Sequence, residues 1–216
     1  MSRAIVFEFL EDLSQNNSKE WMDKNRSRYE TVKSVLIQTF DPILDQLKEI
    51  DPRIVQPNAR KSLSRINNNL MFHPERPTYK DHLGVGFGYG KGLADFYVHL
   101  GVNEQLIAGG LWHPHTSQLK QIRQEIDYEG EKLESLLNHK EFKKHFTIYE
   151  EDSLKGTPKG YAPNHPQIRW LRMKSLAAFR PILKDDFLSD DFGQLVVDSF
   201  VLILPLLDFI NTALKD

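Results

Sequence analysis

The sequence contains no cysteine. A disulfide framework, a thiolate zinc site and a cysteine nucleophile are therefore excluded together, and any metal site would need histidine and carboxylate ligands. The GxSxG turn of α/β hydrolases, the HExxH helix of zinc proteases and the GK[ST] end of a phosphate loop are also missing. We therefore expect no cofactor and no metal.

Long apolar runs are lacking as well. The most apolar stretch, residues 195–210, is shorter than the roughly 20 residues that cross a bilayer, and it contains Asp198 and Asp208. This stretch is typical of a buried core helix. Glu8 and Glu11 interrupt the first apolar run within the length that a signal peptide needs. We expect a cytoplasmic protein that does not associate with a membrane.

Neither sign of charge is in excess, because the formal net charge is -2 and 27% of the residues are charged. This balance gives nucleic acid little support as a partner and argues against a disordered acidic chain. The 216 residues, 40% of them hydrophobic, suffice for a substantial core. We expect one domain over residues 1–216, and composition leaves its oligomeric state undetermined.

Helical spacing dominates the first fifty residues. Apolar residues repeat at steps of three and four over residues 6–13 and again over residues 29–47, which predicts a short helix and a longer one. Asn17 followed by Glu20 resembles a capping box at the start of the longer helix. Pro42 is expected to kink or split that helix.

A large apolar residue alternates with glycine over residues 83–90, at the period of two that defines a strand. One face of this strand would be apolar and the other would be bare backbone. Because glycine in a strand gives nothing to pack, something is expected to approach the bare face closely. Close packing by a neighbouring element is the simpler interpretation, and a ligand floor is the alternative. The glycines are Gly84, Gly86, Gly88 and Gly90.

The middle of the chain predicts consecutive strands joined by short connections, which favour antiparallel hairpins. Strands grouped together between helical regions indicate an α+β fold, in which helices at both ends of the chain flank an antiparallel sheet. The expected strands are residues 63–69, 83–89, 95–102, 105–112 and, as a last short one, 146–149.

The second half of the chain predicts helices around a loop. Thr116 or Ser117 could cap a helix that continues beyond Gly130. Residues 153–166, which are rich in Gly, Pro and Lys, are expected to form a long surface loop. A helix over residues 168–176 and a final helix that begins near Ser189 complete the prediction.

Acidic residues are absent between Ser153 and Lys184, where seven basic residues occur, and residues 53–80 carry six basic residues against Glu75. If both segments faced one cleft, they would favour a phosphate, a carboxylate or a nucleic-acid backbone, with Arg supplying bidentate donors. In the alternative interpretation they pair with the acidic residues of segments 125–152 and 185–198, because structural ion pairs are commoner than anion sites.

Four histidines lie on or beside the expected strands. His113 and His115 have the close spacing of some metal ligand pairs, but no carboxylate stands at a diagnostic offset from them. A structural hydrogen-bonding role fits most of these histidines better, and general acid/base work fits one of them. His82 and His99 are the candidates for proton transfer.

Several short motifs occur in an order that resembles an uncharacterised bacterial and fungal family known only as a domain of unknown function. None of the motifs is specific alone, but the ordered set covers nearly the whole chain. They are NNSKEW at 16–21, RI at 65–66, PTYK at 77–80, GGLWHP at 109–114, IR at 122–123, KGY at 159–161, HP at 165–166 and LRMKS at 171–175.

The resemblance implies a single-domain protein and brings no activity with it. In that family an Arg-Asp pair and a further Arg usually follow the position of Arg65, whereas this chain has Asn68, Asn69 and Met71 before Phe72. This member has therefore lost part of any charged centre that those residues form, or it binds a less charged partner. The family's positions at Arg65, Lys80, Lys159 and Lys174 do match.

The first functional hypothesis is a pocket for a small anionic ligand, with or without catalysis. Residues 71–82 and 155–165 would form it over the glycine face of the sheet, with His82 or His99 as proton carrier. The expected ligand-binding residues are Arg65, Lys80, Trp112, Lys159, Tyr161, His165 and Lys174.

Two alternatives stay open. The first is a non-catalytic module whose basic loops and exposed aromatic residues contact a protein or a nucleic acid, and a flat basic surface would favour it. The second is a metal-dependent hydrolase, which requires His113 or His115 to converge with a carboxylate such as Glu104 or Asp95.

Overall fold

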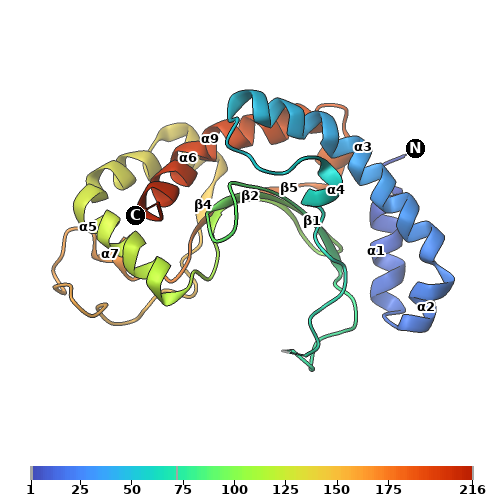
Figure 1. Ribbon diagram of the computed structural model, residues 1–216, viewed down its shortest axis with the longest axis horizontal. Coiled ribbons are helices and arrows are strands. Elements are labelled where there is room, and N and C mark those ends of the chain that lie inside the picture. Colours follow the sequence, from blue (N-terminus) through green and yellow to red (C-terminus); the bar gives the residue numbers. More distant parts are fainter. Residues whose placement is uncertain (1, 72, 216) are drawn as a thin grey trace. The chain divides into compact units, whose positions relative to one another are not determined.

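The computed structural model describes residues 2–71 and 73–215 and has an α+β fold, as the sequence predicts (Figure 1). A five-stranded antiparallel sheet has the strand order β1-β2-β3-β5-β4. The strands are β1 His82–Gly88, β2 Asp95–Gly101, β3 Gln105–Leu111, β4 Thr147–Ile148 and β5 Leu176–Ile182. The helices are α1 Ile5–Gln15, α2 Lys19–Lys24, α3 Arg26–Ile50, α4 Ala59–Ser62, α5 Thr116–Leu137, α6 Lys140–His145, α7 Ile168–Leu171, α8 Lys184–Leu188 and α9 Phe192–Ala213.

The chain forms two compact units, and α9 and strands β1 to β3 contribute to both. The first unit takes the chain up to Phe87, then Tyr97–Ile107 and Pro181–Asp198. The second unit takes Gly88–Phe96, Ala108–Arg180 and the chain from Ser199 onward.

The core of the first unit is rich in aromatic rings. Phe9 of α1 stacks on Tyr29 of α3, with ring centroids 5.6 Å apart. Phe40, also on α3, contacts Phe87 of β1 at 6.1 Å and Phe192 at 5.7 Å. Burying a ring of this size contributes roughly 1.5–3 kcal/mol. Helix α3 therefore covers one face of β1, and the strand's opposite face is left for other contacts.

The start of the chain differs from the prediction in its caps. Ser18, not Asn17, caps α2, because the Ser18 hydroxyl accepts a hydrogen bond from the backbone N–H of Trp21. The Asn17 side chain instead donates to the carbonyl of Tyr79 and accepts from the N–H of Tyr79, both at 2.9 Å. Asn17 thus holds a segment 62 residues away.

Of the two outcomes expected at Pro42, a kink or a split, the split does not occur, and the break in the helical run lies at Asn25 between α2 and α3. The buried residues Phe40, Ile43 and Leu44 lie on both sides of the proline. Their burial holds the helix together, because tertiary packing of an apolar face outweighs the loss of one backbone hydrogen bond.

Residues 63–69 do not form the expected strand. Only two isolated bridges occur there, Leu63 with Val85 and Asn67 with Tyr79. Between them Ile66 turns into the core, with 3% of its surface exposed. Residues 66–68 and 78–80 instead pair as the two arms of a hairpin, through the hydrogen bonds from Lys80 N to Ile66 O and from Asn68 N to Thr78 O.

The core of the second unit is built on α9. Phe96 of β2 packs edge-on against Phe200 of α9, with centroids 5.3 Å apart. A Cβ added at Gly109 would lie 2.7 Å from Cδ1 of Ile203, so the glycine lets α9 approach β3 closely. This approach of a helix is made at Gly109 of β3, outside the glycines of residues 83–90 for which the sequence led us to expect close packing.

The sequence missed strand β5 and overextended the helix before it. That helix is the short α7, and Leu176 belongs to β5 instead. β5 pairs with β4 through Thr147 opposite Phe179. Since Leu176, Ala177 and Ala178 are all buried, the apolar run of β5 lacks the alternation that identifies a half-exposed strand.

The remaining helix starts also shift by a few residues. Helix α5 begins after His115, whose N–H donates to the Gln118 side chain, so neither Thr116 nor Ser117 is the cap. Helix α8 precedes α9, which begins at Phe192. The Ser189 hydroxyl accepts from the N–H of Asp191 just before α9.

Helix α9 is 22 residues long and apolar enough to cross a bilayer by length and composition alone. It is longer than the apolar stretch that the sequence suggests. Its residues Phe192, Phe200 and Ile203 are at most 1% exposed, and 50% of its most apolar 18-residue stretch is buried. Such burial is typical of the core helix of a soluble protein.

Candidate functional site

A histidine pair lies on the face of β1 and β2 that α3 leaves free in the first unit. On β2, Val98 and Leu100 are fully buried, whereas Tyr97 and His99 between them are only partly buried. Gly84 of β1 lies on the same side, because a Cβ there would come within 2.0 Å of the Tyr97 hydroxyl. Glycine on β1 therefore makes room for the ring of Tyr97.

His82 and His99 stack on each other, with ring centroids 4.3 Å apart and planes inclined by 29°. Their side chains are 27% and 15% exposed, respectively. A Cβ at Gly101 would lie 2.9 Å from Nε2 of His99, so this glycine also makes room for a ring. Two neighbouring strands thus supply the two rings, and a glycine without a side chain leaves the space for them.

Carboxylates flank both rings. His82 Nδ1 lies 3.0 Å from Asp81 Oδ1, and this hydrogen bond is the main cause that lowers the pKa of Asp81. Because an ionised carboxylate only accepts, His82 Nδ1–H is the donor. His99 Nε2 lies 4.0 Å from Glu104 Oε1, beyond a direct hydrogen bond.

The electrostatics keep His99 neutral. The pKa of His99 is lowered from 6.5 to about 4, mainly by burial and then by His82 and Lys80, while Asp81 opposes them. Lys80 itself has a lowered pKa, first through burial and then through Arg76. A neutral imidazole near a cation can accept a proton from a group that the cation holds.

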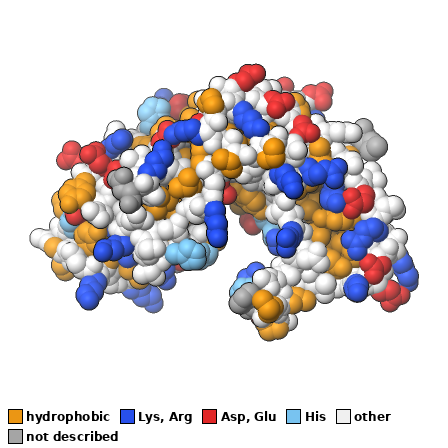
Figure 2. All heavy atoms as spheres, viewed as in Figure 1, with side chains coloured by type: hydrophobic (Ala, Val, Ile, Leu, Met, Phe, Trp, Pro, Cys, Tyr) orange, Lys and Arg blue, Asp and Glu red, His pale blue; other side chains and the backbone are white. Residues whose placement is uncertain are grey.

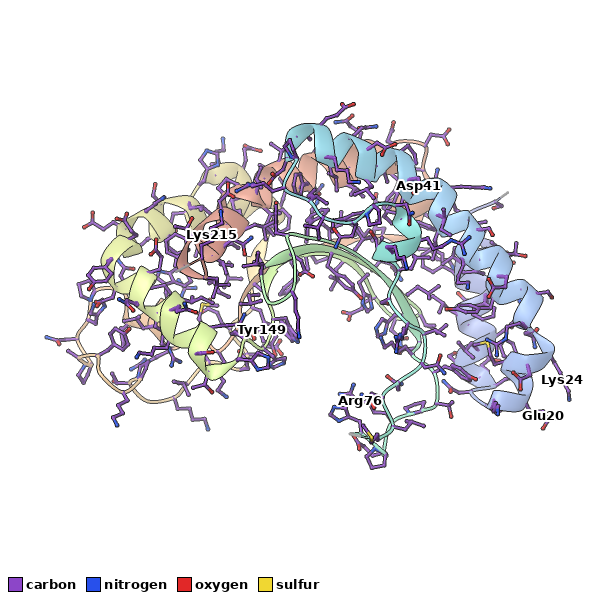
Figure 3. All side chains as sticks on the ribbon, in the orientation of Figure 1. Glu20, Lys24, Asp41, Arg76, Tyr149 and Lys215 are labelled. Atoms are coloured by element: carbon purple, nitrogen blue, oxygen red, sulfur yellow. The ribbon has the colours of Figure 1, made fainter. Side chains whose placement is uncertain are left out.

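The hairpin of residues 66–80 positions Lys80 beside the histidines, and Figure 3 shows Arg76 on the same hairpin. Arg65, just before it, is exposed. Within the residues described, no hydrogen bond or ion pair joins Arg65 to the histidine pair. Of the predicted residues, the structure therefore brings together Lys80, His82 and His99.

The family model described as "Conserved hypothetical protein (DUF2461)" matches residues 5–209. The chain belongs to the DUF2461 family. The resemblance expected from the ordered motifs is therefore confirmed. A comparison with curated proteins gives no match.

Two of the other residues predicted to bind ligand have structural roles in this DUF2461 chain. In the second unit, His165 Nδ1 accepts from the N–H of Gln167 at 3.0 Å, which leaves Nε2–H to donate to Asp127 of α5 at 2.8 Å. Tyr161 contacts the same imidazole, with ring centroids 6.1 Å apart. Both nitrogens of His165 are thus occupied, and the residue fastens the loop of residues 153–166 to α5.

Arg123 of α5 fastens the chain beyond that loop in the same way. Its Nε donates to the carbonyl of Leu171 at 2.8 Å, and its Nη2 donates to that of Met173 at 3.4 Å. The DUF2461 motifs at 122–123, 159–161, 165–166 and 171–175 therefore meet around α5.

The remaining predicted residues, Lys159, Lys174 and Trp112, are exposed members of the second unit. Lys80 and the histidine pair belong to the first unit. A single pocket that joins the two basic segments thus stays a prediction. Lys, Arg and acidic side chains are interspersed over the face shown in Figure 2.

The positions of Asp81, Tyr97 and Glu104 beside the histidine pair were not expected from the sequence. Asp81 directly precedes His82, and the alternation along residues 95–102 already puts Tyr97 on the side of His99. This periodicity was the signal that could have identified Tyr97. Glu104 gave no such signal, because it lies in the turn between β2 and β3.

The described part of the chain gives the metal-hydrolase hypothesis no ligand set. Residues 2–71 and 73–215 contain no group of three or more His, Asp or Glu side chains that could hold a metal ion. His113 faces Asp152, with Nδ1 3.8 Å from Oδ2, rather than Asp95 or Glu104.

Proposed function

We propose that this DUF2461 protein binds a small ligand carrying a phosphate or carboxylate group on the strand face formed by Lys80, His82, Tyr97 and His99. The observation that carries the proposal is the stacked His82–His99 pair beside Lys80, on a face where Gly84 and Gly101 leave room for the rings. Lys80 and Arg76 would hold the anion, because each supplies a charged donor.

His99 gives the site a group that can do chemistry. It is neutral at pH 7, since burial lowers its pKa to about 4, and a neutral imidazole can accept a proton from a bound hydroxyl, amine or water. Proton abstraction next to a bound anion is the reaction type that this arrangement favours. Catalysis rests on His99 alone, so binding is the primary proposal.

The test is a thermal-unfolding screen against phosphate, sulfate, acetate and citrate at constant ionic strength, since a ligand that prefers the native state raises the melting temperature. Lys80→Ala should remove the stabilisation by the best anion, and Lys61→Ala should keep it. Lys61 is a matched control because it is an exposed lysine of the same unit on α4. Equal anion-dependent shifts in both variants would reject the site.

Proton transfer has a separate test. If a screen of phosphorylated and carboxylated compounds yields a turned-over substrate, His99→Gln should lower kcat by roughly 10²–10⁴-fold and change KM little, because general acid/base catalysis contributes about that much. A retained kcat with a raised KM would assign His99 to binding instead.

A cytoplasmic interaction module is the second candidate. It is favoured by exposed apolar side chains next to the tip of the hairpin, where Met71 is 79% and Leu70 is 38% exposed. Soluble monomers tolerate single exposed apolar residues, but adjacent ones suit a partner surface. Affinity capture with wild-type protein and with a Leu70→Ser/Met71→Ser variant would decide, since a partner lost only by the variant supports the module.

A further inference from the structure

Three aromatic rings meet at the surface of the second unit. Trp112, which follows β3, is 54% exposed. Its ring lies 4.4 Å from that of Tyr149 and 4.7 Å from that of His113, measured between centroids. Figure 3 labels Tyr149 in this part of the structure. Tryptophan is large and apolar, so an exposed indole backed by two further rings offers a ready-made contact surface.

A carboxylate lies directly beside these rings. The Asp152 side chain is 16% exposed, and its Oδ2 lies 3.8 Å from His113 Nδ1. The Ser175 hydroxyl donates to the same oxygen at 3.3 Å. The other oxygen, Oδ1, is buried and has no hydrogen-bond partner among the described residues. A carboxylate with so few donors has unused capacity to accept hydrogen bonds.

The backbone at this site is held in an unusual conformation. His113 has a φ of 47°, the left-handed region that residues other than glycine seldom adopt. Its N–H donates to the Ser175 hydroxyl at 3.1 Å, and Ser175 is completely buried. One hydroxyl therefore fixes both the strained backbone of His113 and the position of Asp152. Strain of this kind clusters where a side chain must be presented to a ligand.

The same unit already holds one cation between an indole ring and a carboxylate. The Arg169 guanidinium lies 4.5 Å from the centroid of the Trp170 ring, and its Nε is 3.1 Å from Glu150 Oε2. A cation is thus held between an indole face and a carboxylate within the chain itself. Trp112 with Asp152 has the same two components, an indole and a carboxylate, but with the indole exposed.

We propose that Trp112, Tyr149 and Asp152 form a binding site for a cationic amine, an ammonium or guanidinium group that rests on the rings and takes Asp152 as its counter-charge. Aromatic faces attract such cations through their quadrupole, and the attraction grows when the carboxylate beside them is desolvated. The site lies in the second unit and binds the opposite charge, so it is independent of the anion site proposed above.

The local potential agrees with a cation. Burial first, and then Glu151 and Asp152, raise the pKa of Tyr149, so these two carboxylates act on the ring. Glu150, the third acidic residue of the run, is already paired with Arg169. These two carboxylates would attract a cationic guest and repel an anion.

The experiment follows the three indole N–H signals of Trp21, Trp112 and Trp170 by NMR while choline chloride is added at constant ionic strength. The uncharged isostere 3,3-dimethylbutan-1-ol is the matched control, because it has the same shape without the charge. Choline should shift the Trp112 signal saturably and leave that of Trp170, which is 6% exposed, unmoved. The neutral isostere should bind at least tenfold more weakly.

Variants of the protein test the two components of the site. Asp152→Asn should weaken choline binding about tenfold, and Trp112→Leu, which keeps an apolar side chain on an exposed position, should abolish it. Tyr128→Ala removes an aromatic residue that is 75% exposed in the same unit and should leave the affinity unchanged. If Asp152→Asn lowers the melting temperature, the choline affinities of Trp112→Leu and Tyr128→Ala alone decide whether the site exists.

The proposal is overturned if choline and its neutral isostere shift Trp112 equally, if neither shifts it, or if Trp112→Leu binds choline as well as the wild type does. A parallel titration with N-acetyl-lysine methylamide separates the sources of the cation. A tighter affinity for this compound than for choline indicates the lysine side chain of a peptide, and the reverse order indicates a free quaternary amine. Either order supports the site.

Discussion

Replacing Asn17 by alanine tests how the N-terminal turn supports the candidate anion site. The Asn17 side chain exchanges two hydrogen bonds of 2.9 Å with the backbone of Tyr79, which is 5% exposed and directly precedes Lys80. Asn17→Ala deletes both bonds and leaves a buried N–H and C=O without these partners. The segment that positions Lys80 would then lose its attachment to the start of the chain.

The expected loss follows from those two bonds. A net contribution of about 0.5–1.5 kcal/mol each, with a further cost for the unpaired backbone groups, gives a destabilisation of roughly 2–3 kcal/mol. For a chain of this length each kcal/mol lowers the melting temperature by about 2–4 °C, so we expect a fall of about 5–10 °C. Urea denaturation should show a lower midpoint with an unchanged slope.

Two variants make the result specific. Asn103→Ala removes an exposed asparagine from the turn after β2 and should change the free energy of unfolding by less than about 0.5 kcal/mol. Asn17→Asp keeps an acceptor for Tyr79 N–H but places an oxygen against the Tyr79 carbonyl, so it should cost at least as much as Asn17→Ala. A destabilisation by Asn17→Ala no larger than that of Asn103→Ala would refute the reasoning.

Three further outcomes are expected. The folded state disfavours protonated His99, so the free energy of unfolding should fall as the pH drops from about 6.5 towards 4, and His99→Gln should reduce this fall; equal pH slopes in urea denaturation would contradict it. Gly84→Ala should cost about 1–3 kcal/mol in thermal unfolding because its Cβ would meet Tyr97, whereas Gly156→Ala, with no atom within 4 Å, should cost nothing. Arg123→Ala should speed tryptic cleavage in the loop of residues 153–166, and Lys120→Ala, an exposed change on the same helix, should not.

The fold was predictable where the hydrophobic period was clear. The alternation of Tyr97 and His99 with buried neighbours identified β2, and the spacing of apolar residues identified α1 and most of α3. Strand β5 was missed because its first residues are all buried and thus show no period of two. A split at Pro42, one of the two outcomes expected there, does not occur, since propensity acts locally whereas the burial of Phe40 and Ile43 acts through the tertiary structure.

The candidate site was predictable only in part. His82, His99 and Lys80 were expected on chemical grounds, and the structure brings them together. For Tyr161 and His165 the structure shows contacts that hold a loop, and their expected role at a ligand stays a prediction, because a motif records which residues occur together and not what each one contacts. The sequence shows that Gly101 follows His99 by two residues. Only the structure shows that a Cβ at position 101 would clash with the His99 ring.

The division of α9 between the two units has a consequence for synthesis of the chain. Its residues up to Asp198 belong to the first unit and those from Ser199 to the second, and Phe192 and Phe200 each fill one of the two cores. While the ribosome still holds this helix, Phe40 and Phe96 lack these aromatic neighbours. Neither core is complete until this helix has emerged, so the nascent chain leaves exposed aromatic surface that the finished fold buries.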